Sequence, residues 1–181
     1  MLPLGVTAPE FTLLDTVSKK FMKLNDLMGN KGTMIAFICN HCPFVVPINP
    51  VLSKVAEEYQ QKNIGFIAIS SNDVKRYLQD APHLMQTKAK EEGYAFPYFY
   101  DETQEVARSY HTACTPDFYL FDVGLQLVYR GQLDNSRPGN GIPATGSDLR
   151  KAMDELLQGK VITIPKKPSM GCTIKWKAVQ Y

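Results

Sequence analysis

One continuous apolar run, residues 34–38, organises the pattern of hydrophobic and polar positions along the chain. It lies between the turn residues Gly32-Thr33 and Asn40-His41. A short apolar run bounded by turn signals is typical of a strand buried on both faces. A second apolar run, residues 64–69, follows a segment with apolar residues at helical spacing, namely Leu52, Val55, Ala56 and Tyr59. We therefore expect a strand, a helix and a second, parallel strand, the arrangement called a βαβ unit.

Prolines interrupt the segment between these two strands, at Pro43, Pro47 and Pro50. Proline suits the first turn of a helix but removes a backbone hydrogen bond further along. The spacing therefore predicts a first helical segment over residues 43–48 and a kink or a restart at Pro50.

Shorter patterns predict the remaining elements. Residues 11–14 and 20–24 alternate enough to indicate two N-terminal strands joined by a polar turn. The second half of the chain is predicted to contain a helix from Asp80 to about Glu92, a strand over 96–100, a helix over 104–110, a hairpin of 118–122 with 127–130, and a last helix that Ser147 caps and Gly159 ends. Residues 131–146 form a long loop, and long loops in compact domains are often functional.

The composition is that of an ordinary globular protein. The 181 residues include 44% hydrophobic and 21% charged residues, with a formal net charge of +2. We expect one domain over residues 1–158 and a tail over 159–181 packed on the same domain. The tail has five lysines and no acidic residue. Spaced lysines on an extended segment are usually a solvated surface, so we expect no nucleic-acid partner.

The chain also lacks the signals of a membrane or secreted protein. No apolar run approaches the roughly 20 residues that a membrane-spanning helix needs, so we expect no membrane partner. Residues 1–5 have neither the basic start nor the apolar core of a secretory signal. We therefore expect a cytoplasmic protein, in a compartment where thiols are kept reduced and lasting disulfides are rare.

Four cysteines carry the candidate chemistry, at positions 39, 42, 114 and 172. In a reducing compartment they are redox-active, metal-binding or buried rather than structural disulfides. Cys42 follows the first core strand where a helix is predicted to begin. Unpaired N–H groups at a helix N-terminus stabilise a thiolate, which is the nucleophilic form of cysteine. The position predicts a lowered pKa at Cys42.

The order of elements, with a cysteine after the first core strand, resembles the thioredoxin fold. Thr115-Pro116, directly before a predicted strand, looks like the cis-proline loop of that fold, which faces the cysteine and offers backbone hydrogen bonds to a bound thiol or peptide. The N-terminal hairpin and the opening residues 5–13 resemble the redoxin branch, which includes peroxiredoxins. The motif Asn-His-Cys-Pro-Phe-Val at 40–45, the loop 131–141 and the motif at 171–177 resemble a bacterial peroxiredoxin-like, AhpC/TSA-like subfamily. The resemblance implies an α/β fold with a central mixed sheet flanked by helices.

The chain departs from both standard mechanisms of the fold. Val45 stands where a thioredoxin has its second cysteine, three residues after the nucleophile. Cys39 and Ile35 stand where a peroxiredoxin has threonine or serine and proline. What remains is a shifted pair, Cys39-x-x-Cys42.

These residues predict a thiol-dependent oxidoreductase that reduces a peroxide or a disulfide. Cys42 is the expected nucleophile, and Cys39 or Cys114 is the expected thiol that resolves its oxidised form. The expected substrate-binding residues are Asn40, His41, Thr115, Pro116 and Arg137. The mechanism needs an external thiol reductant and no cofactor, and the chain is expected to be a monomer or a homodimer.

Two alternatives stay open on sequence alone. Cys39, His41 and Cys42 offer soft ligands for copper or zinc, which predicts a metal-binding protein. An inactive redoxin scaffold would have a normal pKa at Cys42. Cys172 in the tail either folds back on the site or, as we expect, anchors the tail together with Trp176. Arg130 and Arg137 are expected to pair with acids such as Asp134.

Overall fold

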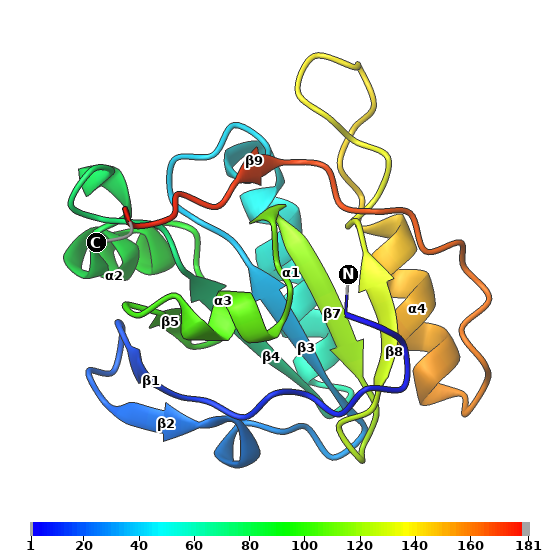
Figure 1. The fold of residues 1–181 in the computed structure, drawn as a ribbon. Helices are drawn as coiled ribbons and strands as arrows, with labels where there is room; N and C mark the ends of the chain where they lie inside the picture. Colours follow the sequence, from blue (N-terminus) through cyan, green and yellow to red (C-terminus); the bar gives the residue numbers. More distant parts are fainter. Residues whose placement is uncertain (1, 179–181) are drawn as a thin grey trace.

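A mixed seven-stranded sheet runs through the protein, whose computed structural model describes residues 2–178 (Figure 1). Its strands are β1 Thr12–Asp15, β2 Phe21–Lys23, β3 Gly32–Phe37, β4 Ile64–Ser70, β5 Tyr98–Tyr100, β7 Asp117–Phe121 and β8 Leu127–Gly131. They lie in the order β2-β1-β5-β4-β3-β7-β8, with β3, β4 and β5 parallel and the other neighbours antiparallel. β6 Cys114–Thr115 and β9 Cys172–Thr173 form a separate pair.

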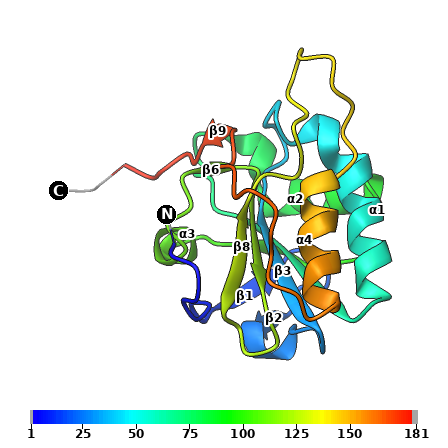
Figure 2. The same cartoon turned by 90° about the vertical axis from the view of Figure 1, so that its right-hand side faces the viewer.

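Helices cover both faces of the sheet. They are α1 Asn49–Gln60, α2 Pro82–Glu91, α3 Glu105–Ser109 and α4 Ser147–Leu157, with 3-10 turns at Leu24–Asp26, Val46–Ile48 and Leu78–Asp80. Figure 2 shows α1, α2 and α4 on one side of the sheet and α3 on the other. The predicted α/β class, with a mixed sheet flanked by helices, is confirmed. The division into a domain and a tail at residue 158 stays a prediction.

The strand β3 forms the centre of both cores because its side chains alternate between the two faces. Met34 and Ala36 pack in the cluster that includes the buried residues of α1, α2 and α4. Ile35 and Phe37 pack in the opposite cluster, which includes residues of α3 and the N-terminal segment. All of β3 is buried, and it pairs in parallel with β4. The prediction of a buried strand within a parallel βαβ unit is confirmed.

The segment after β3 is less helical than the sequence predicted for residues 43–48. Its only helical segment before α1 is the 3-10 turn Val46–Ile48, and α1 begins at Asn49 with Pro50 in its first turn. The restart at Pro50 is confirmed, but Cys42 lies before a turn and not at the N-terminus of an α-helix. The physical reason is that Pro47 and Pro50 lack the N–H groups that a continuous helix would need.

The start of α4 also differs from the prediction. Gly146, with a φ of +72°, is the residue before the helix, and the Ser147 side chain makes no capping hydrogen bond. The Asp134 carboxylate instead accepts hydrogen bonds of 2.7 Å from the N–H groups of Thr145 and Gly146. A carboxylate near the start of the loop 131–146 therefore binds the turn at the end of the same loop that leads into the helix, which the local sequence did not indicate.

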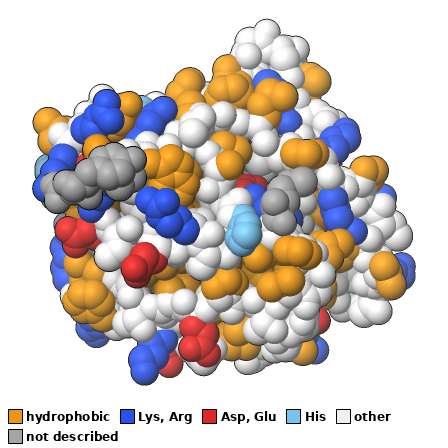
Figure 3. Space-filling model, viewed as in Figure 1, with side chains coloured by type: hydrophobic (Ala, Val, Ile, Leu, Met, Phe, Trp, Pro, Cys, Tyr) orange, Lys and Arg blue, Asp and Glu red, His pale blue; other side chains and the backbone are white. Residues whose placement is uncertain are grey.

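The segment after α4 crosses the molecule as an extended chain, shown from orange to red in Figure 1. Ile162, Ile164 and Ile174 are buried along it. Figure 3 shows basic and acidic side chains on the same face, between areas of uncharged and hydrophobic side chains. Among the described residues, no helix is long and apolar enough to cross a membrane.

Replacing Leu149 tests the packing of α4 on the sheet. The side chain is fully buried, so Leu149→Ala is expected to lower the free energy of unfolding by about 2–5 kcal/mol. Lys151→Ala, at an exposed position of the same helix, is the matched control and is expected to change it by less than about 0.5 kcal/mol. Chemical denaturation measures both values, and equal values for the two variants would contradict the packing described.

Candidate active site

Cys39 and Cys42 lie just beyond the carboxyl end of β3, beside the loop that carries Thr115 and Pro116. The peptide bond between Thr115 and Pro116 is cis. The Cys42 Sγ lies 3.3 Å from the Thr115 carbonyl oxygen, and the Cys39 Sγ lies 3.5 Å from the Thr115 hydroxyl. The structure therefore brings both thiols of the shifted pair together with the predicted loop.

The pairing of β6 with β9 decides which other cysteine faces this pair. Thr115 is directly opposite Cys172, and Cys114 is directly opposite Thr173. Residues directly opposite each other in a sheet point to the same face, and successive residues point to opposite faces. Because Thr115 faces Cys39, Cys172 faces it too. Cys172 also packs against the core cluster that contains Cys39 and Cys42.

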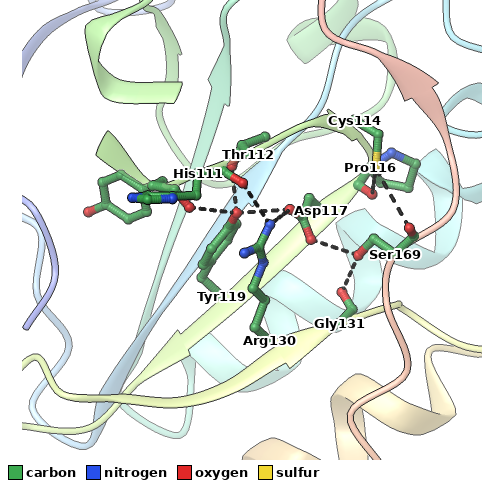
Figure 4. Close-up of polar contacts among 10 residues, drawn as sticks. His111, Thr112, Cys114, Pro116, Asp117, Tyr119, Arg130, Gly131 and Ser169 are labelled. Carbon is green, nitrogen blue, oxygen red and sulfur yellow. Dashed lines mark hydrogen bonds and ion pairs between the residues drawn. The ribbon is translucent and has the colours of Figure 1, made fainter. Parts of the chain in front are cut away.

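Cys114 points to the other face of this small sheet. Its Sγ lies 3.7 Å from the Ser169 carbonyl oxygen and 4.0 Å from that of Pro116, as Figure 4 shows. Strand alternation turns the Cys114 side chain to the other face, while the Cys42 charge still contributes, after burial and the Asp117 carboxylate, to the raised pKa of Cys114. The role of Cys114 as a resolving thiol stays a prediction. Cys172, for which a position at the site was the less favoured alternative to a tail anchor, lies on the face of Thr115 that contacts Cys39. The cysteine in the motif at 171–177 was the available signal, but no local pattern reveals which strand the tail pairs with.

The surroundings of Cys42 lower the pKa of its thiol well below the ordinary value. The largest cause is a hydrogen bond from the Cys39 thiol, and burial opposes it. A hydrogen bond from the Cys172 thiol and the backbone N–H groups of Phe44 and Cys172 act in the lowering direction. The contact with the Thr115 carbonyl favours the protonated form, because there the Cys42 thiol is the donor. The donors outweigh this contact, so the pKa of Cys42 is lowered overall.

The other three thiols are held in the protonated form. The pKa of Cys39 is raised, first by its hydrogen bond to Cys42, then by burial and by the Asp80 carboxylate. Burial raises the pKa of Cys114 to about 11. Burial, followed by the hydrogen bond to Cys42, raises the pKa of Cys172 to about 11. Cys39 and Cys42 thus titrate as a unit in which the first proton leaves Cys42.

Asn40 and His41 are bound to the protein around Asp80 rather than aimed at Cys42. The Asn40 backbone N–H donates to Asp80 at 2.8 Å, and its side chain contacts the Gln79 carbonyl and the Tyr98 hydroxyl. The His41 Nδ1 lies 2.7 Å from an Asp80 carboxylate oxygen, an ion-pair distance without hydrogen-bond alignment. The His41 ring stacks on the Tyr77 ring, at 5.6 Å between centroids. Both residues hold the loop that positions the cysteines.

The structure groups possible metal ligands at Cys39 and His41 as predicted, but with Asp80 in place of Cys42. The ligand atoms of Cys39, His41 and Asp80 lie within 4.8 Å of one another, and Cys42 is not part of this group. The correction follows from the direction of the Cys42 side chain, which faces Thr115 instead. A tetrahedral zinc site would need a fourth ligand, whereas copper(I) accepts fewer soft ligands.

Arg130 pairs with an acid as expected, but with Asp117 rather than Asp134, and Arg137 contacts the backbone of Asp134 instead of its carboxylate. The buried Arg130 donates to the Asp117 carboxylate at 2.8 Å and to the His111 carbonyl at 3.0 Å, as Figure 4 shows. Arg137 donates to the Asp134 and Ser136 carbonyl oxygens and to the Gln132 side chain. Arg137 therefore shapes its own loop.

The Cys42 sulfur is covered in this structure. Cys42 is 0% exposed, and a narrow crevice beside it is lined by Phe44, Pro116, Arg137 and Met170, among others. Among the described residues, a larger hollow of about 550 Å³ lies between β1 and α3, and no cysteine lines it. A molecule reaches the Cys42 sulfur only if the residues that cover it move.

Comparisons with known proteins agree with the fold. The profile of the AhpC/TSA family matches residues 4–130. An uncharacterized conserved protein from Geobacillus kaustophilus is 51% identical, with 99% of this chain and 95% of that chain covered and a TM-score of 0.97. A hypothetical protein from Sinorhizobium meliloti 1021 is 41% identical, with 99% and 97% covered and a TM-score of 0.96.

More distant solved structures share the fold alone. The thioredoxin domain of a thiol-disulfide oxidoreductase from Bacteroides vulgatus is 19% identical, with 73% of this chain and 90% of that chain covered and a TM-score of 0.62. The predicted thioredoxin-like fold is confirmed. No curated protein matches the sequence.

The thiolate absorbance in the ultraviolet tests the hydrogen bond from Cys39. Wild-type protein is expected to keep one thiolate at neutral pH and to lose its absorbance only in the acidic range, because the pKa of Cys42 is lowered. Cys39→Ala removes the hydrogen bond that lowers the pKa of Cys42 most, so the midpoint of the absorbance loss is expected at a higher pH than in wild type. Each pH unit of this shift corresponds to a tenfold change in the ionisation constant of Cys42.

Cys114→Ala is the matched control for this titration and is expected to keep the wild-type midpoint, since Cys114 faces away. An unchanged midpoint in Cys39→Ala would show that Cys39 does not stabilise the Cys42 thiolate.

Proposed function

The chain belongs to the AhpC/TSA family, and from this premise we propose that it is a thiol-dependent oxidoreductase that reduces a peroxide or a disulfide through Cys42. Family membership supports a thioredoxin-like redox function. The choice of nucleophile rests on one observation, which is the set of hydrogen-bond donors around the Cys42 sulfur. A thiolate is the nucleophile in both reactions, and the lowered pKa supplies it at neutral pH.

With a peroxide, the Cys42 thiolate attacks one oxygen and the O–O bond breaks. The second oxygen leaves, takes a proton and departs as water or an alcohol, while Cys42 becomes a sulfenic acid. With a disulfide, the thiolate attacks one sulfur and the S–S bond breaks. The other sulfur leaves as a thiolate, and Cys42 is left in a mixed disulfide. In both cases an external thiol supplies the two electrons that restore Cys42.

The residues around Cys42 have separate roles in this proposal. Cys39 is the largest cause of the lowered pKa of Cys42, and it packs with Cys42 in one core cluster beside Thr115. The loop of Thr115 and Pro116 lies against the sulfur and lines the approach to it. Asn40 and His41 fix the loop between the cysteines through Asp80. The protein is proposed to work in the cytoplasm, where reduced thiols are available.

An inactive redoxin scaffold is the competing hypothesis. It predicts an ordinary thiol at Cys42, because no selection for a nucleophile would maintain donors around a buried sulfur. A cysteine buried without donors has a raised pKa and is inert. The lowered pKa of Cys42 therefore favours the oxidoreductase.

Oxidation by one equivalent of hydrogen peroxide, or of a small disulfide, tests the proposed function. Time-resolved intact mass and peptide mapping are expected to place the first oxidation at Cys42 in wild-type protein. In Cys42→Ser the rate is expected to fall to that of an ordinary protonated thiol, because the only stabilised thiolate is gone. Cys114→Ser is the matched control and is expected to react as wild type. Slow oxidation that affects all cysteines to a similar extent, in all three proteins, would contradict the proposal.

Soft-metal binding is a second candidate, favoured by the grouping of Cys39, His41 and Asp80. If it is correct, protein purified without chelator is expected to carry about one copper or zinc ion per chain by elemental analysis. Asp80→Asn is expected to reduce the metal content, since it removes a carboxylate ligand. Cys42→Ser is the control and is expected to retain the metal, because Cys42 lies outside the group. Metal-free wild-type protein that also fails to bind added copper or zinc would exclude this candidate.

A further inference from the structure

Three thiols meet at this site, and the third comes from the far end of the chain. We propose that Cys172 is the resolving thiol of Cys42, so that each oxidation ends in a disulfide between the tail and the body of the protein. This inference rests on the proposed function of Cys42 as the nucleophile, and it replaces both thiols that the sequence suggested.

The register of the tail places Cys172 over the site. Cys172 is directly opposite Thr115, whose carbonyl oxygen lies 3.3 Å from the Cys42 sulfur. Paired residues of this kind have side chains on the same face of the sheet. Cys172 also packs against the core cluster that contains Cys42, and each of the two thiols influences the pKa of the other. A disulfide requires Cα atoms within about 7 Å, and Thr115, which contacts the Cys42 sulfur and pairs with Cys172, places the two cysteines on either side of one residue.

The tail is held at this position from both sides of Cys172. A Cβ atom on Gly171 would lie 1.9 Å from the Thr115 carbonyl oxygen, so only glycine allows the tail to lie this close. Before it, the Ser169 hydroxyl lies 2.7 Å from the Asp117 carboxylate, in the network of Figure 4. After it, the Ile174 N–H donates to the Ala113 carbonyl at 3.0 Å, and Ile174 is buried.

Exposure separates Cys172 from Cys39 as the resolving thiol. Cys39 is 2% exposed and Cys42 is 0% exposed, so a disulfide between these two would be out of reach of an external thiol. Cys172 is only partly buried, and a disulfide that includes its sulfur presents an atom that a reductant can attack. Cys39 is also the donor that stabilises the Cys42 thiolate, a role that it keeps only as a thiol.

The chemistry balances with a peroxide as the oxidant. After the thiolate attack, Cys42 is a sulfenic acid. The Cys172 sulfur attacks the Cys42 sulfur, the S–O bond breaks, and the oxygen leaves as water with the Cys172 proton. The new S–S bond joins Cys42 to Cys172. An external thiol then attacks Cys172, releases the Cys42 thiolate, and a second thiol completes the two-electron reduction.

The loss of the Cys42 anion favours the resolving step. The negative charge and hydrogen bond of Cys42 are among the causes that raise the pKa of Cys172, and they disappear once Cys42 is oxidised. The nearby Lys175 lowers the pKa of Cys172 and remains in place.

Peptide mapping under non-reducing conditions tests the proposal on the full chain. Wild-type protein, treated with one equivalent of hydrogen peroxide, is expected to lose two hydrogens and to yield one disulfide-linked peptide pair, Cys42 with Cys172. Cys172→Ser is expected to lose this product and to accumulate Cys42 sulfenic acid, trapped as a dimedone adduct. Cys114→Ser is the matched control and is expected to form the disulfide as wild type does.

Three outcomes would overturn the inference, and they can be told apart. A wild-type disulfide between Cys42 and Cys39, or between Cys42 and Cys114, would leave Cys42 as the nucleophile and reject Cys172 as the resolving thiol. A Cys42 sulfenic acid that forms no disulfide in wild-type protein would do the same. No reaction at Cys42, with peroxide or with glutathione disulfide, would reject the proposed function and this inference together. The map of the wild-type protein decides these cases even if Cys172→Ser fails to fold.

Discussion

A charged sulfur beneath the surface is the constraint on which the site depends. Burial opposes the ionisation of Cys42, so a thiolate exists there only if donors compensate for the lost water. The donors are the Cys39 thiol, the Cys172 thiol and the backbone N–H groups of Phe44 and Cys172. They come from three separate segments, the end of β3, the turn after Cys42 and the tail. The thiolate therefore depends on the whole fold, not on one helix N-terminus.

The cis-proline loop links these segments. Thr115 contacts both thiols of the shifted pair and pairs with the tail at Cys172. Asp117, just after the loop, is buried with Arg130 and also contacts Ser169 of the tail. A buried ion pair adds little net stability but is strongly destabilising when one partner is removed. Here it fixes the position of the loop against β8, and the tail is attached to the same carboxylate.

The tail has two effects on the chemistry. It covers Cys42 and so restricts access to small oxidants, or to larger substrates that displace it. It also carries Cys172, which we propose as the partner thiol of Cys42. A fold that lacks the second cysteine at position 45 can therefore obtain a partner thiol from a segment that is more than a hundred residues away in the sequence.

Much of the fold could be predicted from the sequence, because apolar runs and turn residues are local signals. The buried strand at residues 34–38, its parallel partner and both hairpins followed from such patterns. The helix start at Pro43 was wrong because the effect of Pro47 and Pro50 on the backbone outweighs the apolar spacing. Asp80, Asp134 and Cys172 could not be assigned, since their partners are set by long-range contacts that leave no periodicity. The side to which Cys114 points depends on a two-residue strand, too short to show alternation.

Residue-specific NMR of the four cysteines, labelled at Cβ and followed through a pH titration, tests the central claim most directly. The chemical shift of each Cβ reports whether its own sulfur is protonated. The account predicts that at neutral pH Cys42 alone is a thiolate, while Cys39, Cys114 and Cys172 are thiols. A protonated Cys42 at neutral pH, or a charge that resides on another cysteine, would contradict it.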